Sequence, residues 1–291
     1  MDFKSSNPKK LILISFLLCL LVLAVLYFSQ KPDGKLHLVF CDVGQGDAIL
    51  ITDPKGNQIL VDGGPDSSVL SCLSENMPFW DRTLEMVVST HPEKDHFGGL
   101  VEVLARYKIE KILHTQATNK GDDFAAFIKA VDNPKIAKIV TRRGQKIQFS
   151  GGSWAEVFWP ADGNFPYGAL SSLNEESVVL EIAYGNFCAV LPGDIDSSVE
   201  QTLLSLGGLS NCPVLKFPHH GSKTGVSDIF LKTIAPKAAI ISVGENNKFG
   251  HPTDEALTSL SKVGAKIFRT DKNGEVEVLT DGKSYKVETE K

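Results

Sequence analysis

The chain has 291 residues, of which 42% are hydrophobic and 22% are charged, and its formal net charge is −5. This composition excludes the fibrous and disordered classes of protein, and the length suits one large domain or two small ones. Without the five lysines and two aspartates of residues 1–35, the rest has 25 basic and 33 acidic residues, a net charge of −8. An acidic body does not attract nucleic acid in general, so such binding would need a local basic patch.

The first predicted element is an uncharged apolar stretch at residues 11–29, long enough to span a bilayer as a helix. A secretory signal peptide also has a basic start and an apolar core, but this stretch is longer than a usual signal core and no small-x-small cleavage site follows it. We predict an uncleaved, single-pass anchor, preceded by a cytoplasmic basic start at residues 1–10. A linker at residues 30–35 and an extracytoplasmic domain at residues 36–291 would follow, although two lysines after the stretch weaken the charge asymmetry.

The five cysteines form no C-x-x-C pair, which argues against a thiolate zinc site. Cys19 lies inside the predicted anchor. Cys41 and Cys188 lie in apolar, strand-like runs, where a free buried thiol is the simpler expectation. Disulfide bridges among the four later cysteines are the alternative in an exported domain.

The first half of the domain changes from a strand pattern to a helix pattern near residue 90. Residues 36–62 contain three short β-rich runs separated by Gly-Gln-Gly-Asp and Asp-Pro-Lys-Gly, which predicts hairpin connections. A further run, MVVST, ends in the charged segment HPEKDHFGG. The apolar spacing of LVEVLARYKI, directly behind it, predicts a helix.

The second half repeats this organisation. The segment SVVLEIAYGNFCAVLPGD predicts two strands and a tight turn, ending at Asp194, and PVLKFP predicts a strand that ends in HHGS. Residues 161–176, rich in Gly, Pro and Asn, predict a loop. Two halves of this kind predict two sheets packed face to face with helices outside, a four-layer αββα sandwich of the α/β class in one domain.

Polar clusters follow the ends of successive strand-like runs. Ligand-binding groups gather at such strand ends, so these clusters can share one rim. Imidazole and carboxylate groups together are ligands for zinc, manganese or iron, and two adjacent ions would activate a bridging water. The clusters are Asp62, then His91 with Glu93, Asp95 and His96, then Asp194, the pair His219 and His220, and His251.

The segment HPEKDHFGG resembles the H-x-[HD]-x-D-H metal-binding motif of the metallo-β-lactamase superfamily. The segments DVGQGDAILI, ILVDGG, SVVLEI, LPGD, FPHHGS and NKFGHP are similar to the hydrolase domain of the ComEC/Rec2 competence protein family. The similarity runs from about His37 to Pro252. It implies a metallo-β-lactamase-like hydrolase domain at residues 36–291, binding one or two divalent ions (Zn²⁺ or Mn²⁺). The implied substrate is a phosphodiester, with single-stranded DNA during uptake as the candidate the family suggests.

The resemblance also assigns roles to individual residues. The implied metal ligands are His91, Glu93, Asp95, His96, the bridging Asp194, and His220. Asp95, His219 and His251 form the implied catalytic group, with His219 as a proton donor or a partner of the ligands and His251 facing the substrate. Asp62 would support the site. Which of His219 and His220 binds metal stays open, although we favour His220.

Several alternatives accompany these roles. Asp194 alone could cap the following helix, and Lys223 is as plausible a solvated lysine as a phosphate-binding one. Glu93 occupies a place in the motif that histidine or aspartate usually holds. No histidine lies between His114 and His219, where many members of the superfamily supply a third ligand to the first metal, and Asn174 or Ser177 stands there instead. The first metal position would then lack a ligand, which leaves open an enzyme that binds a single metal, prefers manganese or binds metal weakly. A non-catalytic metal-binding surface module is a further alternative. The acidic body favours a small cell-envelope phosphodiester over DNA.

Overall fold

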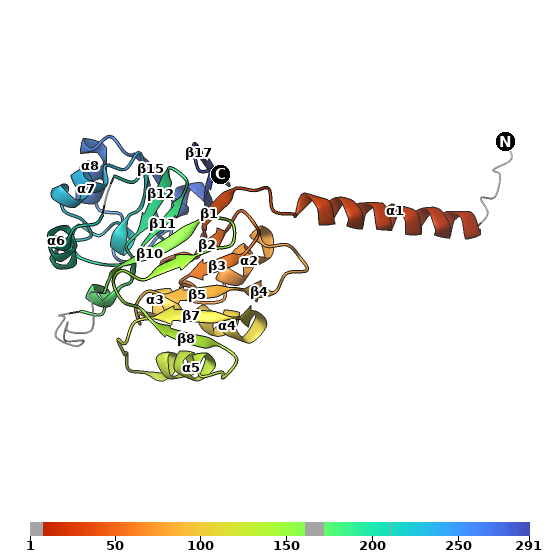
Figure 1. Cartoon of the computed structure of the whole chain (residues 1–291), viewed down its shortest axis with the longest axis horizontal. Coiled ribbons are helices and arrows are strands. Elements are labelled where there is room, and N and C mark those ends of the chain that lie inside the picture. The colour runs from red at the N-terminus through yellow and green to blue at the C-terminus, as the bar shows by residue number, and fades with distance from the viewer. Residues whose placement is uncertain (1–7, 161–171, 210) are drawn as a thin grey trace.

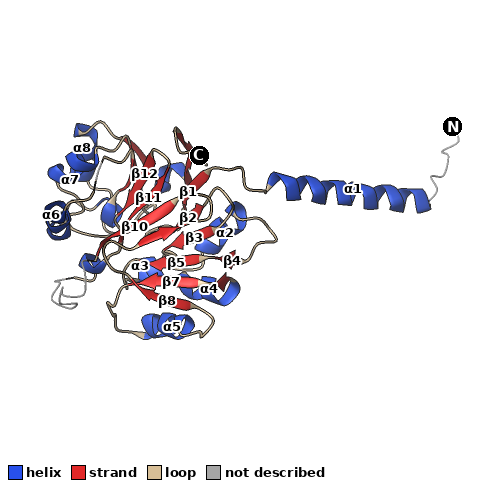
Figure 2. Ribbon diagram, viewed as in Figure 1, coloured by secondary structure: helices blue, strands red, loops and turns tan. Residues whose placement is uncertain are grey.

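The structure is a computed structural model that describes residues 8–160, 172–209 and 211–291. Two β-sheets pack face to face, and helices cover their outer faces (Figures 1 and 2). The predicted four-layer αββα sandwich is therefore confirmed. Most of the predicted loop at residues 161–176 and most of the basic start at residues 1–10 lie outside the described residues.

The first sheet has eight strands in the order β17-β16-β1-β2-β3-β5-β7-β8. The neighbours from β3 to β8 are parallel, and the other neighbours are antiparallel. A separate pair joins β4 (Thr83–Leu84) and β6 (Lys108–Ile109). The strands of the first sheet are β1 (Leu36–Phe40), β2 (Ile49–Thr52), β3 (Gln58–Val61), β5 (Met86–Ser89), β7 (Lys111–His114), β8 (Ala137–Val140), β16 (Val276–Thr280) and β17 (Tyr285–Thr289).

The second sheet has seven strands in the order β15-β14-β13-β12-β11-β10-β9. Here β12 to β15 are parallel to one another and β9 to β12 are antiparallel neighbours. Its strands are β9 (Lys146–Gln148), β10 (Trp154–Trp159), β11 (Val179–Tyr184), β12 (Phe187–Leu191), β13 (Val214–Lys216), β14 (Ala238–Ile241) and β15 (Lys266–Arg269).

The helices divide between the two outer faces (Figure 2). Helices α2, α4 and α5 pack on the first sheet, and α6, α7 and α8 pack on the second. The helices are α1 (Pro8–Ser29), α2 (Val69–Asn76), α3 (Lys94–Phe97), α4 (Leu100–Arg106), α5 (Asp122–Val131), α6 (Ser197–Leu206), α7 (Asp228–Ile234), α8 (Asp254–Lys262) and α9 (Thr270–Asn273), with 3₁₀ turns η1 (Asn174–Glu176) and η2 (Pro218–Gly221).

The alternation of side chains along β1 explains how one strand serves two layers. Leu38 and Phe40 point into the core between the sheets, whereas Val39 and Cys41 pack under the helices of the outer layer. Successive side chains of a strand point to opposite faces, so an almost continuous apolar run is required when both faces are covered. The strands that lead to the polar clusters are therefore held from both sides.

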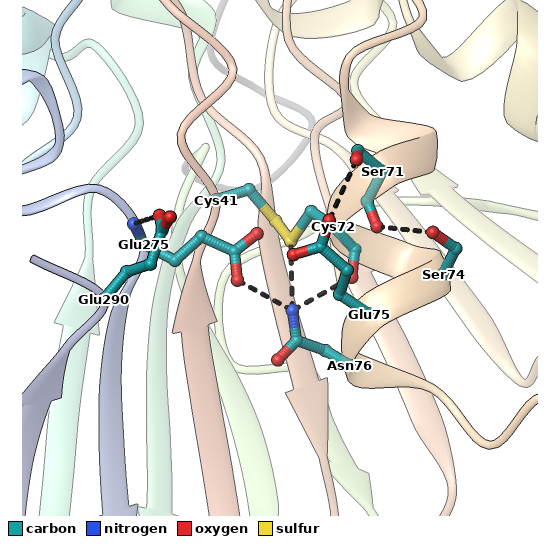
Figure 3. Close-up of a disulfide and its surroundings, with 8 residues drawn as sticks. All are labelled: Cys41, Ser71, Cys72, Ser74, Glu75, Asn76, Glu275 and Glu290. Carbon is teal, nitrogen blue, oxygen red and sulfur yellow. Dashed lines mark hydrogen bonds between the residues drawn. A yellow bond between two sulfur atoms is a disulfide. The ribbon is translucent and has the colours of Figure 1, made fainter.

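The four cysteines of the domain form two disulfides, Cys41–Cys72 and Cys188–Cys212. The expectation of free buried thiols was wrong, because the first bridge joins the end of β1 to α2 in space although 31 residues separate the two cysteines. Figure 3 shows the Asn76 amide beside this bridge, donating to the Cys72 carbonyl at 2.9 Å and to a Glu275 carboxylate oxygen at 2.8 Å. Disulfides form and persist in oxidising compartments.

Helix α1 projects from the domain as a separate rod (Figure 1). Among the described residues it is the one helix that is long and apolar enough to cross a membrane, by length and composition alone. Its side chains are exposed from Leu11 to Phe28.

Candidate metal centre

The predicted polar clusters meet at one edge of the sandwich. Asp62 follows β3 and His91 follows β5 in the first sheet, whereas Asp194 follows β12 and His220 follows β13 in the second. All four strands point the same way within their sheets toward this edge, so their carboxyl ends bring side chains from distant sequence positions together. The predicted strand ends therefore do share one rim.

Three buried imidazoles present the same nitrogen to the centre. The Nδ1 atom of His96 donates to Asp62 Oδ2 at 2.8 Å, and that of His220 donates to the Ser242 carbonyl at 3.0 Å. Thr90 Oγ1 donates its proton to Asp62, so it accepts from His91 Nδ1 at 3.0 Å. The Nε2 atoms of His91, His96 and His220 are buried and have no hydrogen-bond partner among the described residues. A held Nδ1 and an open Nε2 are the usual state of a metal-binding histidine.

Asp194 lies between the imidazoles. Its Oδ2 atom is 3.3 Å from His96 Nε2 and 3.1 Å from His220 Nε2, and Asp95 Oδ2 is 3.4 Å from the same His220 nitrogen. Two sets of ligand atoms, each within 4.8 Å of one another, are His91, His96 and Asp194, and Asp95, His96 and His220. This geometry suits the bridging position expected for Asp194. The alternative of a helix cap is wrong, because Asp196 caps α6.

The glycine pair of HPEKDHFGG is required by close backbone packing. A Cβ atom on Gly98 would lie 2.2 Å from the Pro65 carbonyl oxygen, and one on Gly99 would lie 2.0 Å from the Gly63 carbonyl oxygen. The loop after β3 therefore rests directly on the start of α4. That loop holds Asp62 in the left-handed region, at φ 58°, which aspartate tolerates better than most residues. The charged segment ends in glycines because the loop carrying Asp62 must touch it.

His219 and His220 have backbone strain. Both are left-handed, with φ of 51° and 52°, which is uncommon for residues other than glycine. The His219 N–H donates to Asp194 Oδ1 at 3.1 Å, and the His220 ring is fixed by Ser242. Strain of this kind costs on the order of 1–3 kcal/mol and persists where the surroundings impose it, commonly at functional sites.

Two buried residues of the site are absent from the sequence-based prediction. Lys216 is fully buried, forms an ion pair with Asp47, and lies 3.3 Å from Asp194 Oδ1 and 3.1 Å from the Gly193 carbonyl. Asp47 comes from the loop after β1, where its N–H donates to the Asp95 carbonyl at 3.2 Å. The signal was a lysine within the apolar run Val-Leu-Lys-Phe, since a lysine is almost never buried unless paired.

Electrostatics divides the histidines into two groups. Burial and the neighbouring His96 hold the pKa of His91 well below its usual value. Burial alone would lower the pKa of His96 and of His220, but the Asp194 carboxylate beside them raises both well above the usual value. Burial opposes ionisation of Asp194 as well, yet His220, His96 and Lys216 hold its pKa well below normal. The centre is therefore rich in negative charge that cations or protons must balance.

Carboxylates outnumber the cationic side chains of the centre. Five carboxylates surround it, against one buried ammonium, Lys216, in the described part of the chain. Ionised together, they exceed that ammonium by four negative charges, which protonated histidines or bound cations can balance. Those carboxylates are Asp47, Asp62, Glu93, Asp95 and Asp194.

The remaining predicted residues lie around the rim. Glu93 is half-buried at the start of α3, and burial, then Asp95, raises the pKa of its carboxyl. Asn174 Nδ2 lies 3.4 Å from His219 Nε2, whereas Ser177 Oγ accepts from the Asp194 N–H at 3.0 Å. Lys223 is exposed.

A stacked pair of rings lies beside His219. The His251 ring centroid is 5.8 Å from that of His219, and Phe249 stacks on His251 at 5.8 Å with an interplanar angle of 27°. The Lys248 ammonium lies 5.3 Å from the centre of the Phe249 ring, which is 56% exposed. Asn247 holds this loop, since its amide donates to the His251 carbonyl at 2.7 Å and its Oδ1 accepts the His251 N–H at 3.0 Å.

Residues 41–245 match the profile of the Metallo-beta-lactamase superfamily. The chain belongs to this superfamily. It is 26% identical over 272 residues to ComE operon protein 3 of Bacillus subtilis (strain 168), covering 88% of this chain and 34% of that protein. It is 28% identical over 268 residues to Recombination protein 2 of Haemophilus influenzae, covering 91% of this chain and 31% of that protein. The chain thus spans about a third of the length of these curated relatives, and the predicted resemblance to competence proteins is confirmed.

Solved structures with the superfamily fold agree with this assignment. The metallo-beta-lactamase fold protein YhfI from Bacillus subtilis is 14% identical, with a TM-score of 0.52 over 80% of this chain and 95% of that one. CmlA, a diiron beta-hydroxylase from Streptomyces venezuelae, is 12% identical, with a TM-score of 0.53 over 85% of this chain and 54% of that one. These identities show the fold alone. Membership of the superfamily supports a metal-dependent hydrolase that binds one or two divalent ions.

Proposed function

We propose that the chain is a membrane-anchored, metal-dependent phosphodiesterase that cleaves single-stranded nucleic acid, as a nuclease of the ComEC-like type would during DNA uptake. The observation that carries the proposal is the arrangement of three buried Nε2 atoms around Asp194. These atoms, on His91, His96 and His220, make no hydrogen bond within the described part of the chain, and two of them lie 3.1–3.3 Å from Asp194 Oδ2. Asp95 and Glu93 would complete the ligand set. Zinc and manganese are the ions we expect, since both accept imidazole and carboxylate ligands.

The roles of the residues follow from their positions. Divalent ions, when bound, lower the pKa of water and stabilise negative charge on phosphoryl oxygens. Asp62 fixes the His96 ring through Nδ1, and Lys216 lies 3.3 Å from Asp194 Oδ1, so the Asp194 side chain is held where it could ligate a bound ion. Burial lowers the pKa of His219 and of His251, so both are neutral near pH 7. They would then donate hydrogen bonds to substrate oxygens, a role that suits His219 better than that of a charged acid.

The loop that carries Phe249 favours nucleic acid as the substrate. A continuous stack lies next to His219: the His251 ring contacts it, Phe249 stacks on His251, and the Lys248 ammonium lies over Phe249. The Phe249 ring is exposed, so a ligand can reach it. Proteins that bind single-stranded nucleic acid commonly stack aromatic side chains on the bases and place cationic side chains beside the phosphate backbone. Lys223, three residues after His220 and exposed, would add a phosphate contact. The two lysines, Lys248 and Lys223, would supply the local positive charge that the acidic body lacks.

The anchor and the disulfides support an extracytoplasmic location. Helix α1 would hold the chain in the cell membrane as a single span, with the basic start in the cytoplasm. The two disulfides stabilise a domain that folds in an oxidising compartment.

The test is hydrolysis by the full chain in detergent, with its metal content verified. We expect cleavage of single-stranded DNA and of bis-p-nitrophenyl phosphate with manganese or zinc, and loss of both activities in Asp95→Asn. Absence of turnover with either metal, in protein that contains two equivalents, would refute the phosphodiesterase.

The second candidate is a non-catalytic metal-binding module at the cell surface. It is favoured by Asn174 and Ser177, which stand where the resemblance implies that many members of the superfamily carry a further histidine ligand. Metal binding without turnover on any phosphodiester would support it. A third possibility, hydrolysis of small cell-envelope phosphodiesters, would show as turnover of small substrates in the absence of DNA cleavage.

A further inference from the structure

Aromatic side chains from two distant segments meet where α1 joins the domain. Tyr27, in the last turn of α1, contacts Trp80 with ring centroids 4.8 Å apart, and Phe79 packs on Trp80 at the same distance. The Phe79 N–H donates to the Gln30 side chain at 3.1 Å, which ties the connection between α2 and β4 to the end of the helix. Lys31 lies 4.9 Å from the Phe28 ring centre. We call Tyr27, Phe28, Lys31, Phe79 and Trp80 the aromatic cluster.

The rings of the cluster are exposed although they are apolar. Phe79 is 53% exposed, Trp80 41% and Phe28 65%, so large rings face outward on the side from which α1 leaves. Figure 1 shows the connection between α2 and β4 protruding on that same side. Exposed rings that gather in this way mark an interaction surface.

The length of α1 places the cluster at the membrane boundary. The apolar span Pro8–Phe28 has 21 residues, and at 1.5 Å per residue it is about 31 Å long, close to the ~30 Å of a bilayer's hydrocarbon core. The hydrocarbon would therefore end near Tyr27 and Phe28, the rings that contact the cluster's other members. Tryptophan and tyrosine concentrate at this depth because their rings are apolar and their polar groups reach water.

We infer that Phe79 and Trp80 insert into the membrane interface beside α1. The domain would then dock on the lipid surface instead of being attached to the membrane through the linker alone. The occupant of this surface is the bilayer, because the cluster is continuous with the helix that spans it. Lys31 would contact lipid phosphates from the same level. The linker adds only six residues between Ser29 and Leu36, which keeps the domain close to the membrane.

Docking in this way turns the metal centre away from the bilayer. β1 starts at Leu36 beside the anchor, and its other end leads to Asp47 in the centre. β5 likewise starts two residues after β4 and ends before His91, and Figure 1 shows α3 and α1 on opposite sides of the domain. A four-residue strand alone separates the two ends by about 13 Å. The consequence rests on the proposed function: a site that faces away from lipid suits a soluble strand better than a lipid head group.

Fluorescence quenching by brominated lipids tests the docking without any reference to activity. The full chain has three tryptophans, Trp80, Trp154 and Trp159, of which Trp159 is buried and Trp154 is half-buried in the second sheet. The full chain is reconstituted into vesicles whose lipids carry bromine near the head group. We expect quenching of the wild type, loss of the larger part of it in Trp80→Phe, and retention of it in the matched control Trp154→Phe.

The outcomes separate the docking from the anchor and from the enzyme. Alkaline extraction of the same vesicles reports whether α1 is embedded. If α1 is embedded and Trp80→Phe leaves the quenching unchanged, the docking is overturned. It is also overturned if Trp154→Phe abolishes the quenching, because another face of the domain would then contact the lipid. Quenching carried by Trp80 in a chain without turnover would leave the docking in place and refute only the proposed activity.

Discussion

Replacing Lys216 by methionine tests whether the centre depends on a buried cation of the chain itself. The side chain is fully buried and lies between Asp47 and Asp194, with no other ammonium near these carboxylates in the described residues. Burial would lower the pKa of Lys216, but the two carboxylates raise it above the usual value, so the ammonium stays charged. Methionine keeps much of the volume of lysine and removes the charge.

The geometry gives the size of the effect. At the 3.3 Å that separates Lys216 Nζ from Asp194 Oδ1, the attraction is about 5 kcal/mol for an effective dielectric constant of ~20. Removing one partner of a buried pair typically costs about 3–5 kcal/mol, because the other charge is left buried and uncompensated. We therefore expect Lys216→Met to lower the free energy of unfolding of the metal-free chain by about that amount.

The measurement is denaturant unfolding of the full chain in detergent, followed by the fluorescence of the domain. Lys237→Met, at an exposed position, is the matched control and should change stability by less than about 0.5 kcal/mol. The double variant Lys216→Met/Asp47→Asn should regain at least about 2 kcal/mol, since it removes both charges of one pair. Metal should restore part of the loss by supplying positive charge to Asp194.

A loss below about 1 kcal/mol in metal-free Lys216→Met would refute this reasoning. The carboxylates would then be neutral or solvated, and the network would not be a buried one. A double variant as unstable as the sum of the single ones would show that Lys216 and Asp47 do not interact.

Three further predictions concern the rim, the ligands and a buried acid. Phe249→Ala should raise KM for single-stranded DNA about 5- to 150-fold, from ~1–3 kcal/mol of stacking, and leave an abasic strand unaffected; equal effects on both would contradict stacking. His220→Ala and Asp194→Asn should lose metal, whereas His219→Ala should keep it and turn over roughly 10- to 100-fold more slowly, as metal analysis and kinetics will show. Burial raises the pKa of Glu200 to about 8, so stability should fall as pH rises from the ordinary carboxyl value to about 8. Glu200→Gln should flatten that slope in unfolding measured across the range.

The sequence predicted the fold and most of the centre because strand ends are local features. Alternating or continuous apolar runs located β3, β5, β12 and β13, and the polar residue after each run was a candidate on position alone. Asp62, His91, Asp194 and His220 were found in this way, and the structure brings all four together. Their roles as ligands stay a prediction.

The residues that sequence reasoning missed depend on contacts between distant segments. Lys216 lies inside an apolar strand, and only the packing of β13 against the loop of Asp47 gives its ammonium a partner. The Cys41–Cys72 bridge likewise joins a strand to a helix, a pairing that spacing alone does not determine. Such partners follow from the tertiary fold, which a linear pattern describes only coarsely.

The buried charges explain how the centre can be assembled before any ion binds. Lys216 lies against Oδ1 of Asp194. His96 and His220 lie against Oδ2, and their raised pKa values mean that protons on these imidazoles can balance the charge there before any cation binds. Binding a divalent ion must then displace protons from imidazole, whereas Lys216 can stay. The negative charge of Asp194 is therefore balanced by exchangeable imidazole protons on one side and by the fixed Lys216 ammonium on the other. That asymmetry leaves Asp194 Oδ2, on the side of His96 and His220, available to a bound ion.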